Sequence, residues 1–405
     1  MGNHCPDETA RHGGERRRQD EVNGSVQQRL PGLPKEVHGH HDDAARRPVL
    51  AHYGLLGLDA KAAVEKGLAS AKWYSCPIGR KELKELMKRS DGPALRDTAL
   101  WFGVLAVSGA AAYALWGSWW AVIPFAIYGV LYGSASDSRW HECGHGTPFK
   151  TRWMNDGVYN IASFMVFREP TVWRWSHTRH HTDTIIVGLD PEINVMRPAD
   201  VLAILLNVFA IKNTLHGFKL LFIHAAGRLD AEEATFIPDM ERPKVFRTAR
   251  IWLAIFALVA AACWLSHSIL PAMFVGLPTM YGSWLQLLFG LTQHAGLDED
   301  VLDHRLNSRT VMMNPVLRFL YWNMNYHIEH HMFPMVPYHA LPRLHAIIKH
   351  DCPDPYPSLY AAFAEIIPAV LRQAMDPAYF VERKLPSGAR PLDMGPVPTG
   401  MAAAE

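Results

Sequence analysis

The chain has 405 residues, a formal net charge of +1 and 49% hydrophobic residues, so its charge gives no bulk attraction to nucleic acid or to acidic partners. The five cysteines form no C-x-x-C pair, which excludes a thiolate zinc or iron–sulfur ligand set, and their odd number suits a reducing compartment. Histidine is abundant, with 22 residues, and neutral imidazole is the commonest metal ligand in proteins, so the histidine clusters are the feature to follow.

The first 70 residues are predicted to be a disordered polar segment. Residues 1–47 contain three consecutive arginines at 16–18 and no apolar core, so they do not read as a secretory signal. A membrane domain is expected over residues 71–385. The Pro- and Gly-rich residues 386–405 are expected to be a flexible tail.

The first apolar block follows a basic stretch at residues 72–96. From Thr98 to Ser134 there is no Asp, Glu, Lys or Arg over 37 residues. A single helix of that length would overshoot a hydrocarbon core of about 30 Å, because each residue adds about 1.5 Å. The turn is expected at Gly117–Ser118. The two predicted membrane spans cover residues 98–117 and 118–136.

The second apolar block runs from Ile251 to Gln293, again without a formal charge. Ser266, His267 and Pro271 mark a break in it. The two further predicted spans cover residues 250–268 and 270–293.

The segments outside the hairpins set the expected orientation. Arg and Lys cluster before the first hairpin and after both hairpins, while neither hairpin turn has any, so the positive-inside rule places both termini in the cytoplasm. Two further apolar segments, 157–167 and 200–226, are short or interrupted, and they are predicted to lie on the membrane surface.

Three histidine clusters flank the predicted hairpins on the cytoplasmic side. They read H-E-C-G-H at 141–145, H-T-R-H-H at 177–181 and H-I-E-H-H at 327–331. Residues three and four positions apart share one helix face, so the imidazoles of each cluster converge. His294 ends the last predicted span, where it either joins the ligands or bonds a carbonyl. The nine candidate ligands are His141, His145, His177, His180, His181, His294, His327, His330 and His331.

Nine imidazoles are too many for one ion, because a zinc site has about four ligands. Two ions sharing them would have four or five each. Imidazole suits iron, zinc, copper and nickel alike, so ligand type alone does not choose the metal. H-E-x-x-H by itself is also the signature of a zinc protease, but that reading leaves six histidines unexplained. A metal transporter is a third alternative, although its histidines should lie within the spans rather than at their ends.

The three boxes, their order around two hairpins and the run N-Y-H-I-E-H-H-M-F-P at 325–334 resemble the membrane fatty-acid desaturase superfamily. The resemblance covers residues 95–350. It implies an all-α integral membrane protein with four transmembrane helices in two hairpins, and a cytoplasmic helical cap that holds two non-haem irons on histidines. Within the superfamily, the chain looks more like a bacterial branch that includes the hydrocarbon oxygenase of rhizopine catabolism and the dihydrorhizobitoxine desaturase.

The resemblance implies an activity. These enzymes use O2 and two electrons to attack an unactivated C–H bond, so desaturation of a fatty-acyl or lipid substrate is expected. The alternatives are a hydroxylase or O-demethylating oxygenase of a small polar molecule, and a desaturase of an amino-acid derivative. The location implied is the bacterial inner membrane, with the active site and both termini facing the cytoplasm.

Two departures from the superfamily pattern matter. Gly290 stands where some animal acyl-CoA desaturases have Asn, which puts the ligand set near His294 in doubt. The chain has no cytochrome b5-like or Rieske-like segment, so the electrons are expected from a separate ferredoxin or Rieske-type ferredoxin with its reductase.

Acidic residues beside the boxes are candidates for hydrogen bonds to imidazole N–H groups. Glu142 and Glu329 lie inside boxes but off the ligand face, and Asp183, Asp190 and Glu192 follow the second box. The alternative is that the loop acids are solvated. The isolated histidines are expected at the membrane interface, and they are His216, His224, His267, His339 and His345.

Overall fold

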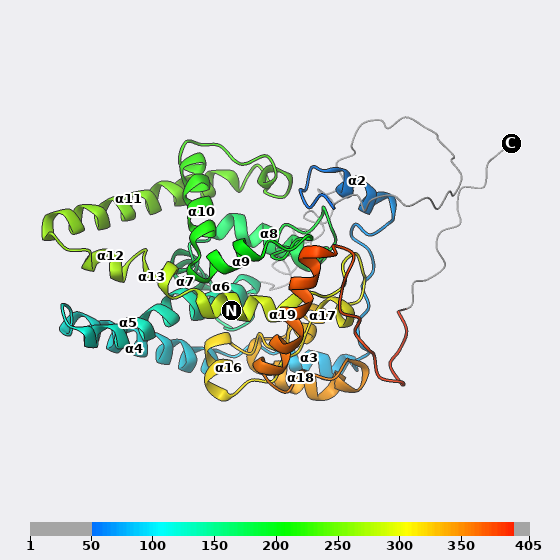
Figure 1. Cartoon of the computed structure of the whole chain (residues 1–405). Coiled ribbons are helices and arrows are strands. Elements are labelled where there is room, and N and C mark those ends of the chain that lie inside the picture. The colour runs from blue at the N-terminus through cyan, green and yellow to red at the C-terminus, as the bar shows by residue number, and fades with distance from the viewer. Residues whose placement is uncertain (1–50, 393–405) are drawn as a thin grey trace, which may run out of the picture. The chain divides into compact units, whose positions relative to one another are not determined.

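The described part of the chain is built from helices (Figure 1). The computed structural model describes residues 51–392, which lie in the unit Pro48–Glu405. Within these residues the only extended pairings are isolated bridges, between Thr310 and Tyr326 and between Val311 and Tyr356. The all-helical fold class predicted from the sequence is therefore confirmed for residues 51–392.

The helices fall into two sets along the chain. Up to the second apolar block they are α2 (Leu58–Glu65), α3 (Arg80–Leu86), α4 (Asp91–Ala114), α5 (Val122–Gly129), α6 (Ser136–His145), α7 (Arg152–Met165), α8 (Pro170–Thr182), α9 (Val201–Leu206) and α10 (Ile211–Ala225). From there on they are α11 (Arg242–Ser266), α12 (Leu270–Phe274), α13 (Pro278–Tyr281), α14 (Trp284–His294), α15 (His304–Asn307), α16 (Pro315–Tyr321), α17 (His327–Met332), α18 (Leu341–Ile348) and α19 (Leu359–Met375). Short 3₁₀ turns are η2 (Trp119–Ala121), η4 (Asn207–Phe209), η5 (Glu233–Thr235), η6 (Tyr338–Ala340) and η7 (Lys349–Asp351), and η3 (Val130–Ala135) is a π-helix.

The first apolar block folds as a hairpin at the predicted turn. Helix α4 begins at Asp91, before the predicted start of the span at residue 98, and ends at Ala114. The chain then turns through Gly117, whose φ of 88° lies in the left-handed region that glycine tolerates. It returns through α5, which packs against α4 (Figure 1).

The second arm of this hairpin runs as one helix into the first histidine box. The backbone stays helical from α5 through the π-helix η3 into α6. A side chain at Gly133 of η3 would come within 2.6 Å of the carbonyl oxygen of Pro278, and Ser134 Oγ donates to the carbonyl oxygen of Gly282. The π-helix therefore lies tightly against the chain between α13 and α14, immediately before the box. Short π-segments within α-helices are frequent at functional sites.

The predicted fourth span is not one helix, and this part of the prediction is corrected. Helix α11 ends at Ser266, close to the predicted break, but residues 270–293 divide into α12, α13 and α14. Gly276 has a φ of 98°, and prolines lie in the first turns of α12 and α13, where they suit the start of a new helix but have no N–H for a ladder running on from the preceding segment. The absence of charge identified an apolar segment, but it carries no information about these breaks.

Two helical stretches in the described residues are long and apolar enough to cross a membrane, Arg80–Ala114 and Arg242–Ser266. A third candidate is the pair α9–η4 and α10, which is bent by 77°. Both of its arms expose large apolar side chains, as expected for residues 200–226: Leu202, Leu205, Leu215 and Phe222. Two or three candidate spans are fewer than the four predicted, because neither the predicted span 118–136 nor the broken one at 270–293 is among the candidates.

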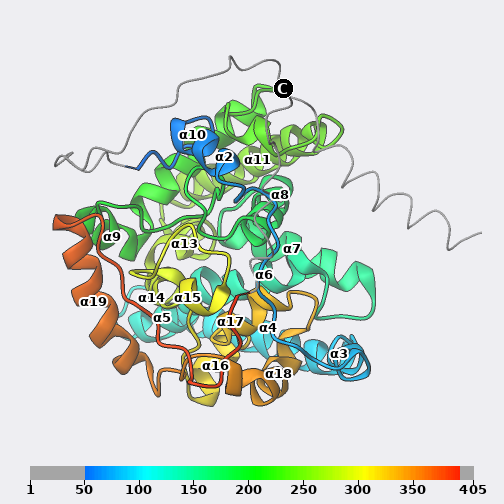
Figure 2. The same cartoon turned by 90° about the vertical axis from the view of Figure 1, so that its right-hand side faces the viewer.

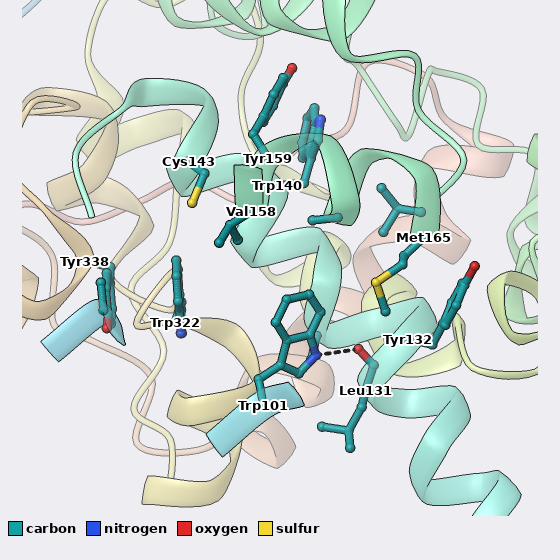
Figure 3. Packing of buried hydrophobic residues seen from close by; sticks show 14 of the residues in the cluster. Trp101, Leu131, Tyr132, Trp140, Cys143, Val158, Tyr159, Met165, Trp322 and Tyr338 are labelled. Atoms are coloured by element: carbon teal, nitrogen blue, oxygen red, sulfur yellow. Dashed lines mark hydrogen bonds between the residues drawn. The ribbon is translucent and has the colours of Figure 1, made fainter. Parts of the chain in front are cut away.

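A buried core joins the first hairpin to the box helices (Figure 3). Trp101 of α4 is fully buried, and its Nε1 donates to the carbonyl oxygen of Leu131 at 2.9 Å. Arg139 of α6 is buried between the rings of Trp101 and Trp322. Its guanidinium donates to backbone carbonyls, among them that of Leu320 on α16 at 2.6 Å. A buried guanidinium needs such acceptors, so this contact fixes the orientation of α6 and of the first box.

The ordered part of the unit extends beyond both expected domain boundaries. Residues 1–50 and 393–405 lie outside the described residues, so disorder there stays a prediction. Residues 51–70 were expected to lack structure, yet they contain α2, whose Ala60 and Ala63 pack against Ile186. In the expected tail, the backbone N–H of Arg390 donates to Asp351 Oδ1 at 2.8 Å. The segment between α2 and α3 crosses the face that is turned toward the viewer in Figure 2.

Candidate metal centre

Four helices carry the nine predicted ligands. Helix α6 carries the first box, α8 the second and α17 the third, while His294 is the last residue of α14. Helix α8 starts where the sequence provides both an N-cap acceptor and a proline: the Glu169 side chain accepts from the N–H of Val172 at 2.7 Å, and Pro170 occupies the first turn. Each box is thus helical, as its spacing predicts.

The nine imidazoles gather into two groups. The first histidine group is His141, His145, His177, His181 and His330, with one ring nitrogen from each within 4.8 Å of the others. The second histidine group contains His180, His294 and His331 on the same criterion. We include His327 in the second group because its Nε2 lies 3.0 Å from Nε2 of His294 and 3.0 Å from Nε2 of His331. The second and third boxes contribute to both groups, so no box forms a site alone.

The second histidine group is fixed from behind by hydrogen bonds. The Nδ1 donors and their acceptors are His180 with Asp190 Oδ2 (2.8 Å), His294 with Asn307 O (2.7 Å) and His331 with Thr184 Oγ1 (3.2 Å). The Thr184 oxygen acts as the acceptor because its own hydrogen is donated to the carbonyl oxygen of His180. These bonds place the hydrogen of each neutral imidazole on Nδ1, and they leave the Nε2 lone pair facing the centre of the group.

The ring nitrogens meet more closely than their hydrogens allow. His294 and His331 both present Nε2 lone pairs to Nε2 of His327, which carries at most one hydrogen and therefore satisfies at most one of the two contacts. Buried lone pairs facing each other are unfavourable unless a cation lies between them. The donor set in this structure therefore fits bound metal ions.

The first histidine group has fewer such supports. His177 Nδ1 donates to Glu192 Oε2 at 2.9 Å, and the same carboxylate accepts from Ser176 Oγ at 2.8 Å. The Nε2 atom of His177 lies within 3.2 Å of two other Nε2 atoms, again more contacts than one hydrogen can satisfy. Three other members have a buried Nδ1 with no hydrogen-bond partner among the described residues: His141, His181 and His330.

Glu142 lies behind the first group rather than inside it. Its side chain is fully buried, and Oε1 is 3.4 Å from Nδ1 of both His141 and His330, just too far for a charge-assisted hydrogen bond. Burial raises the pKa of Glu142 to about 8. A zinc protease needs this Glu beside the open position of the metal, on the Nε2 side. Its place on the Nδ1 side does not fit the hydrolytic role.

Burial also sets the protonation of the ligands. It lowers the pKa values of six imidazoles well below their ordinary value, and the neighbouring imidazoles add to the effect: His141, His145, His181, His327, His330 and His331. For His180, burial is outweighed by the Asp190 carboxylate, which raises the pKa. The six rings are therefore neutral near pH 7, which is the state that binds a metal.

Only some of the predicted acidic partners form hydrogen bonds with box histidines in the structure. Asp190 and Glu192 bond box histidines, as the sequence analysis expected. Asp183 does not, because its Oδ1 accepts from the backbone N–H of Ser70 at 3.0 Å. Glu329 does not either: it accepts from Thr310 Oγ1 at 2.6 Å and pairs with Nδ1 of His345. The predicted roles of Asp183 and Glu329 are corrected accordingly.

Several functional neighbours were missed by the sequence analysis. His304 is buried, stacks on Trp73 with ring centroids 4.3 Å apart, and lies 5.0 Å from the ring of His331. It belongs to no box, so spacing gives no signal for it. His345 and His224 were assigned to the membrane interface, but both are paired inside the protein, His224 with Glu233 at 2.7 Å.

Comparison with known proteins identifies the family. A model of the fatty acid desaturase family matches residues 117–363, which is more than half of the chain and includes all three boxes. The chain belongs to the fatty acid desaturase family. Members of this family are oxidoreductases, and the two histidine groups are the part of this chain that can bind metal.

Three relatives are similar to this chain at low identity. They are the chloroplastic omega-3 fatty acid desaturase of Glycine max (24% identical, 59% of this chain and 56% of the relative), the acyl-lipid (7-3)-desaturase of Rebecca salina (22%, 56% and 57%) and the acyl-lipid 8-desaturase of Rebecca salina (25%, 73% and 69%). The chain spans a little over half the length of the first two relatives.

Two cavities reach the histidine groups. The first, of about 250 Å³ including space open to solvent, lies against the first group, and its lining includes Trp140, Tyr159, Trp173, Arg174 and Thr178. The second, of about 410 Å³ including space open to solvent, reaches His294 of the second group. Its lining includes polar and charged side chains: Glu192, Asn194, Arg197, Glu299 and Gln373.

The charged wall of the second cavity is an ordered network. Arg197 Nε lies 3.3 Å from Glu299 Oε1, and Tyr53 Oη donates to the same carboxylate at 3.0 Å. Burial raises the pKa of Glu299 to about 7, with Arg197 opposing the shift. A polar substrate group can therefore approach the second group without losing hydrogen-bond partners.

Proposed function

We propose that the chain is an O2-dependent, non-haem di-iron oxidoreductase that removes hydrogen from an unactivated C–H bond of a fatty-acyl or lipid substrate. It spans the bacterial inner membrane with four segments, of which α12–α14 form a broken fourth, and its histidine cap and both termini face the cytoplasm. A separate ferredoxin or Rieske-type ferredoxin, with its reductase, supplies two electrons per turnover.

The observation that carries this proposal is the division of nine imidazoles into two groups with inward-facing nitrogens. Each group offers four or five nitrogens, which is enough for one ion and leaves positions for small ligands. Imidazole-rich sites suit iron, and the desaturase family model supports this choice over zinc. The acyl-lipid desaturases among the relatives support a lipid substrate.

The chain's own residues have separable roles in this proposal. Iron bound at the two groups supplies O2 activation and the cleavage of a C–H bond. Asp190 and Glu192 hold His180 and His177 in one tautomer and orientation, so the ring nitrogens need no rearrangement. The rings of Trp140, Tyr159 and Trp173, with Arg174 and Thr178, line an approach to the first group.

The test is the metal content and the product. Detergent-purified protein is reconstituted anaerobically with ferrous iron and examined by elemental analysis, and about two irons per chain are expected. It is then given reduced ferredoxin, phospholipid and O2, and an unsaturated fatty acid is sought by mass spectrometry, with an anaerobic sample as control. One tightly held zinc and no iron would refute the proposal.

A second candidate is favoured by the cavity beside His294. Its Arg197–Glu299 wall suits a small polar molecule better than an acyl chain, so a hydroxylase or an O-demethylating oxygenase is the alternative. The iron-loaded protein is offered a small polar methyl ether under the same conditions. Formaldehyde release without change to the phospholipid would favour this candidate over acyl desaturation.

A further inference from the structure

An extended strap, residues 70–76, crosses the box helices of the described unit. Two hydrogen bonds tie it to the end of α8: the backbone N–H of Ser70 donates to Asp183, and Trp73 Nε1 donates to the carbonyl oxygen of Thr182 at 2.9 Å. A third joins the backbone N–H of Tyr74 to the carbonyl oxygen of Leu302 at 2.9 Å. The strap is thus tied both to the second box and to the loop before α15. Figure 2 shows this segment in front of α6 and α17, between α2 and α3.

The strap places an aromatic ring in line with the second histidine group. Trp73, which is half-buried, stacks on His304 with centroids 4.3 Å apart and an angle of 3° between the planes. His304 is 2% exposed, and its ring lies 5.0 Å from that of His331. Three rings therefore form a continuous path from the protein surface to a predicted metal ligand. Electron tunnelling is fastest where the gaps between groups are this short.

The surface around Trp73 carries exposed positive charge. Lys72 is its neighbour in the strap, while Lys349 of η7 and Arg390 lie beside the Tyr74–Asp351 contact; all three side chains are exposed. The acidic groups at this place are buried in pairs, since the guanidinium of Arg305 binds both Asp303 and Asp351. The exposed face is therefore basic, and it suits a partner with an acidic surface.

The strap also lies where a water-soluble protein can reach it. In Figure 1 the segment between α2 and α3 runs along the side opposite the far ends of α4, α5 and α11. Those helices include the two stretches long and apolar enough to cross a membrane. A partner at the strap is thus kept clear of the lipid.

We propose that a small acidic electron carrier of the [2Fe–2S] ferredoxin type docks over the strap, and that Trp73 and His304 conduct its electrons to the second histidine group. This rests on the proposed function. Each docking event oxidises one reduced carrier by one electron. Two electrons, two protons, O2 and two hydrogens from neighbouring substrate carbons give one C=C bond and two water molecules, so the electrons and atoms balance.

The docking half is tested by affinity. Iron-loaded full-length protein is titrated with a reduced plant-type [2Fe–2S] ferredoxin at low ionic strength, and binding is followed by calorimetry. The triple variant Lys72→Glu, Lys349→Glu, Arg390→Glu is expected to bind at least tenfold more weakly. The matched control Lys150→Glu, Arg152→Glu, Arg228→Glu reverses three exposed charges elsewhere and is expected to bind within threefold of the unmodified chain. Equal binding by the two triple variants, or no binding by the unmodified chain, would overturn the proposal.

The conducting half is tested by stopped-flow oxidation of reduced ferredoxin under anaerobic conditions. Trp73→Leu is expected to slow this oxidation at least tenfold with iron content and ferredoxin affinity unchanged, while Trp73→Phe, which keeps a stacked ring, stays within threefold. Reduction by dithionite, a small reagent that needs no docking, is expected to be equal in all variants. A Trp73→Leu variant that ferredoxin reduces at the unmodified rate would overturn the proposal, as would an equal loss of rate with dithionite.

Failure of the proposed function would be seen separately. In that case the unmodified chain would contain no iron and no centre that dithionite reduces. That result would remove the electron route too, whereas loss of the route alone would leave a chain with two irons that dithionite still reduces.

Discussion

The two histidine groups differ in what holds their imidazoles from behind. In the second group, Nδ1 of three of the four members, His180, His294 and His331, donates to a fixed acceptor on the protein, while the buried Nδ1 of His327 has no partner among the described residues. In the first group only His177 has a carboxylate partner, and three buried Nδ1 atoms have no hydrogen-bond partner among residues 51–392. The second group is therefore preorganised by the protein, while the first depends more on its bound ion for its geometry.

The difference has a chemical use. The first group borders the aromatic cavity at Trp140 and Trp173, where an incoming molecule needs room. The second is packed on one side against His304, which stacks on Trp73, and its cavity is lined by His294 alone of the four members. We therefore expect the first group to tolerate changes of ligand position and the second to resist them.

Removing a ligand from the preorganised group is expected to have the largest effect. His180→Ala should lower the iron content from about two to one or fewer per chain and reduce turnover at least hundredfold, because His180 is a buried ligand held by Asp190. Elemental analysis and product formation measure this. The matched control is His216→Ala, an exposed histidine on α10, which should leave both values unchanged. Wild-type iron content in His180→Ala would remove the second box from the site.

Replacing the carboxylates that lie behind the ligands should affect the two groups to different degrees. Asp190→Asn is expected to weaken iron binding at the second group about 10- to 100-fold, since the amide no longer holds His180 as a charged acceptor does. Glu142→Gln should weaken binding at the first group by less than tenfold, because no hydrogen bond to a ligand is lost. Competition with a chelator measures both affinities. The reverse order would contradict the view that the second group is preorganised.

Metal removal should loosen the two groups unequally. After treatment with a chelator, amide hydrogen exchange is expected to rise about tenfold or more at the end of α6 and less than threefold at the end of α14, where His294 keeps its bond to Asn307. Exchange detected by mass spectrometry resolves these peptides. Equal loss of protection in both would show that outer hydrogen bonds do not preserve the second group.

The smallest effect concerns the cavity wall beside the second group. Burial raises the pKa of Glu299 to about 7, above an unfolded value of about 4.3, so the folded state binds the extra proton between these values. Stability from this group therefore falls as pH rises from about 4.3 to 7, and the loss is complete above that. The free energy of unfolding of Glu299→Gln should therefore rise relative to that of the parent between pH 5 and pH 8, by at most about 3 kcal/mol, and the difference in Tm should grow with it. A pH-independent difference in Tm would show that Glu299 does not titrate in this window.

Much of the site could be predicted from local sequence because the boxes are local features. The i, i+3 and i+4 spacing puts the imidazoles of a box on one helix face without any tertiary information. The partition into two groups could not be predicted, because His177 and His180 of a single box go to different groups and only the packing of α6, α8, α14 and α17 decides this.

The hydrogen-bond partners of the ligand histidines were predicted only in part, again because packing decides them. Asp190 and Glu192 follow the second box closely, and the loop returns them to it. Asp183 is nearer in sequence but caps the strap at Ser70 instead. His304 lies 27 residues before His331 in the chain and in no repeat, so only the fold brings it there. The prediction of the fourth span as one helix was wrong because hydropathy depends on side chains, whereas Gly276 and the prolines act through the backbone.

The π-helix at Val130–Ala135 fixes the rotational phase of everything that follows it in α6. A π-turn accommodates one residue more than an α-turn, and each residue of an α-helix turns the chain by about 100°. Because the wide turn absorbs the extra residue, deleting one residue from this segment would leave His141 and His145 in phase, whereas inserting one into the regular part of α6 before His141 would turn both imidazoles about 100° away from their partners. Single-residue length changes between Ser136 and Trp140 are thus the mutations that α6 tolerates least, although none of them would touch a ligand.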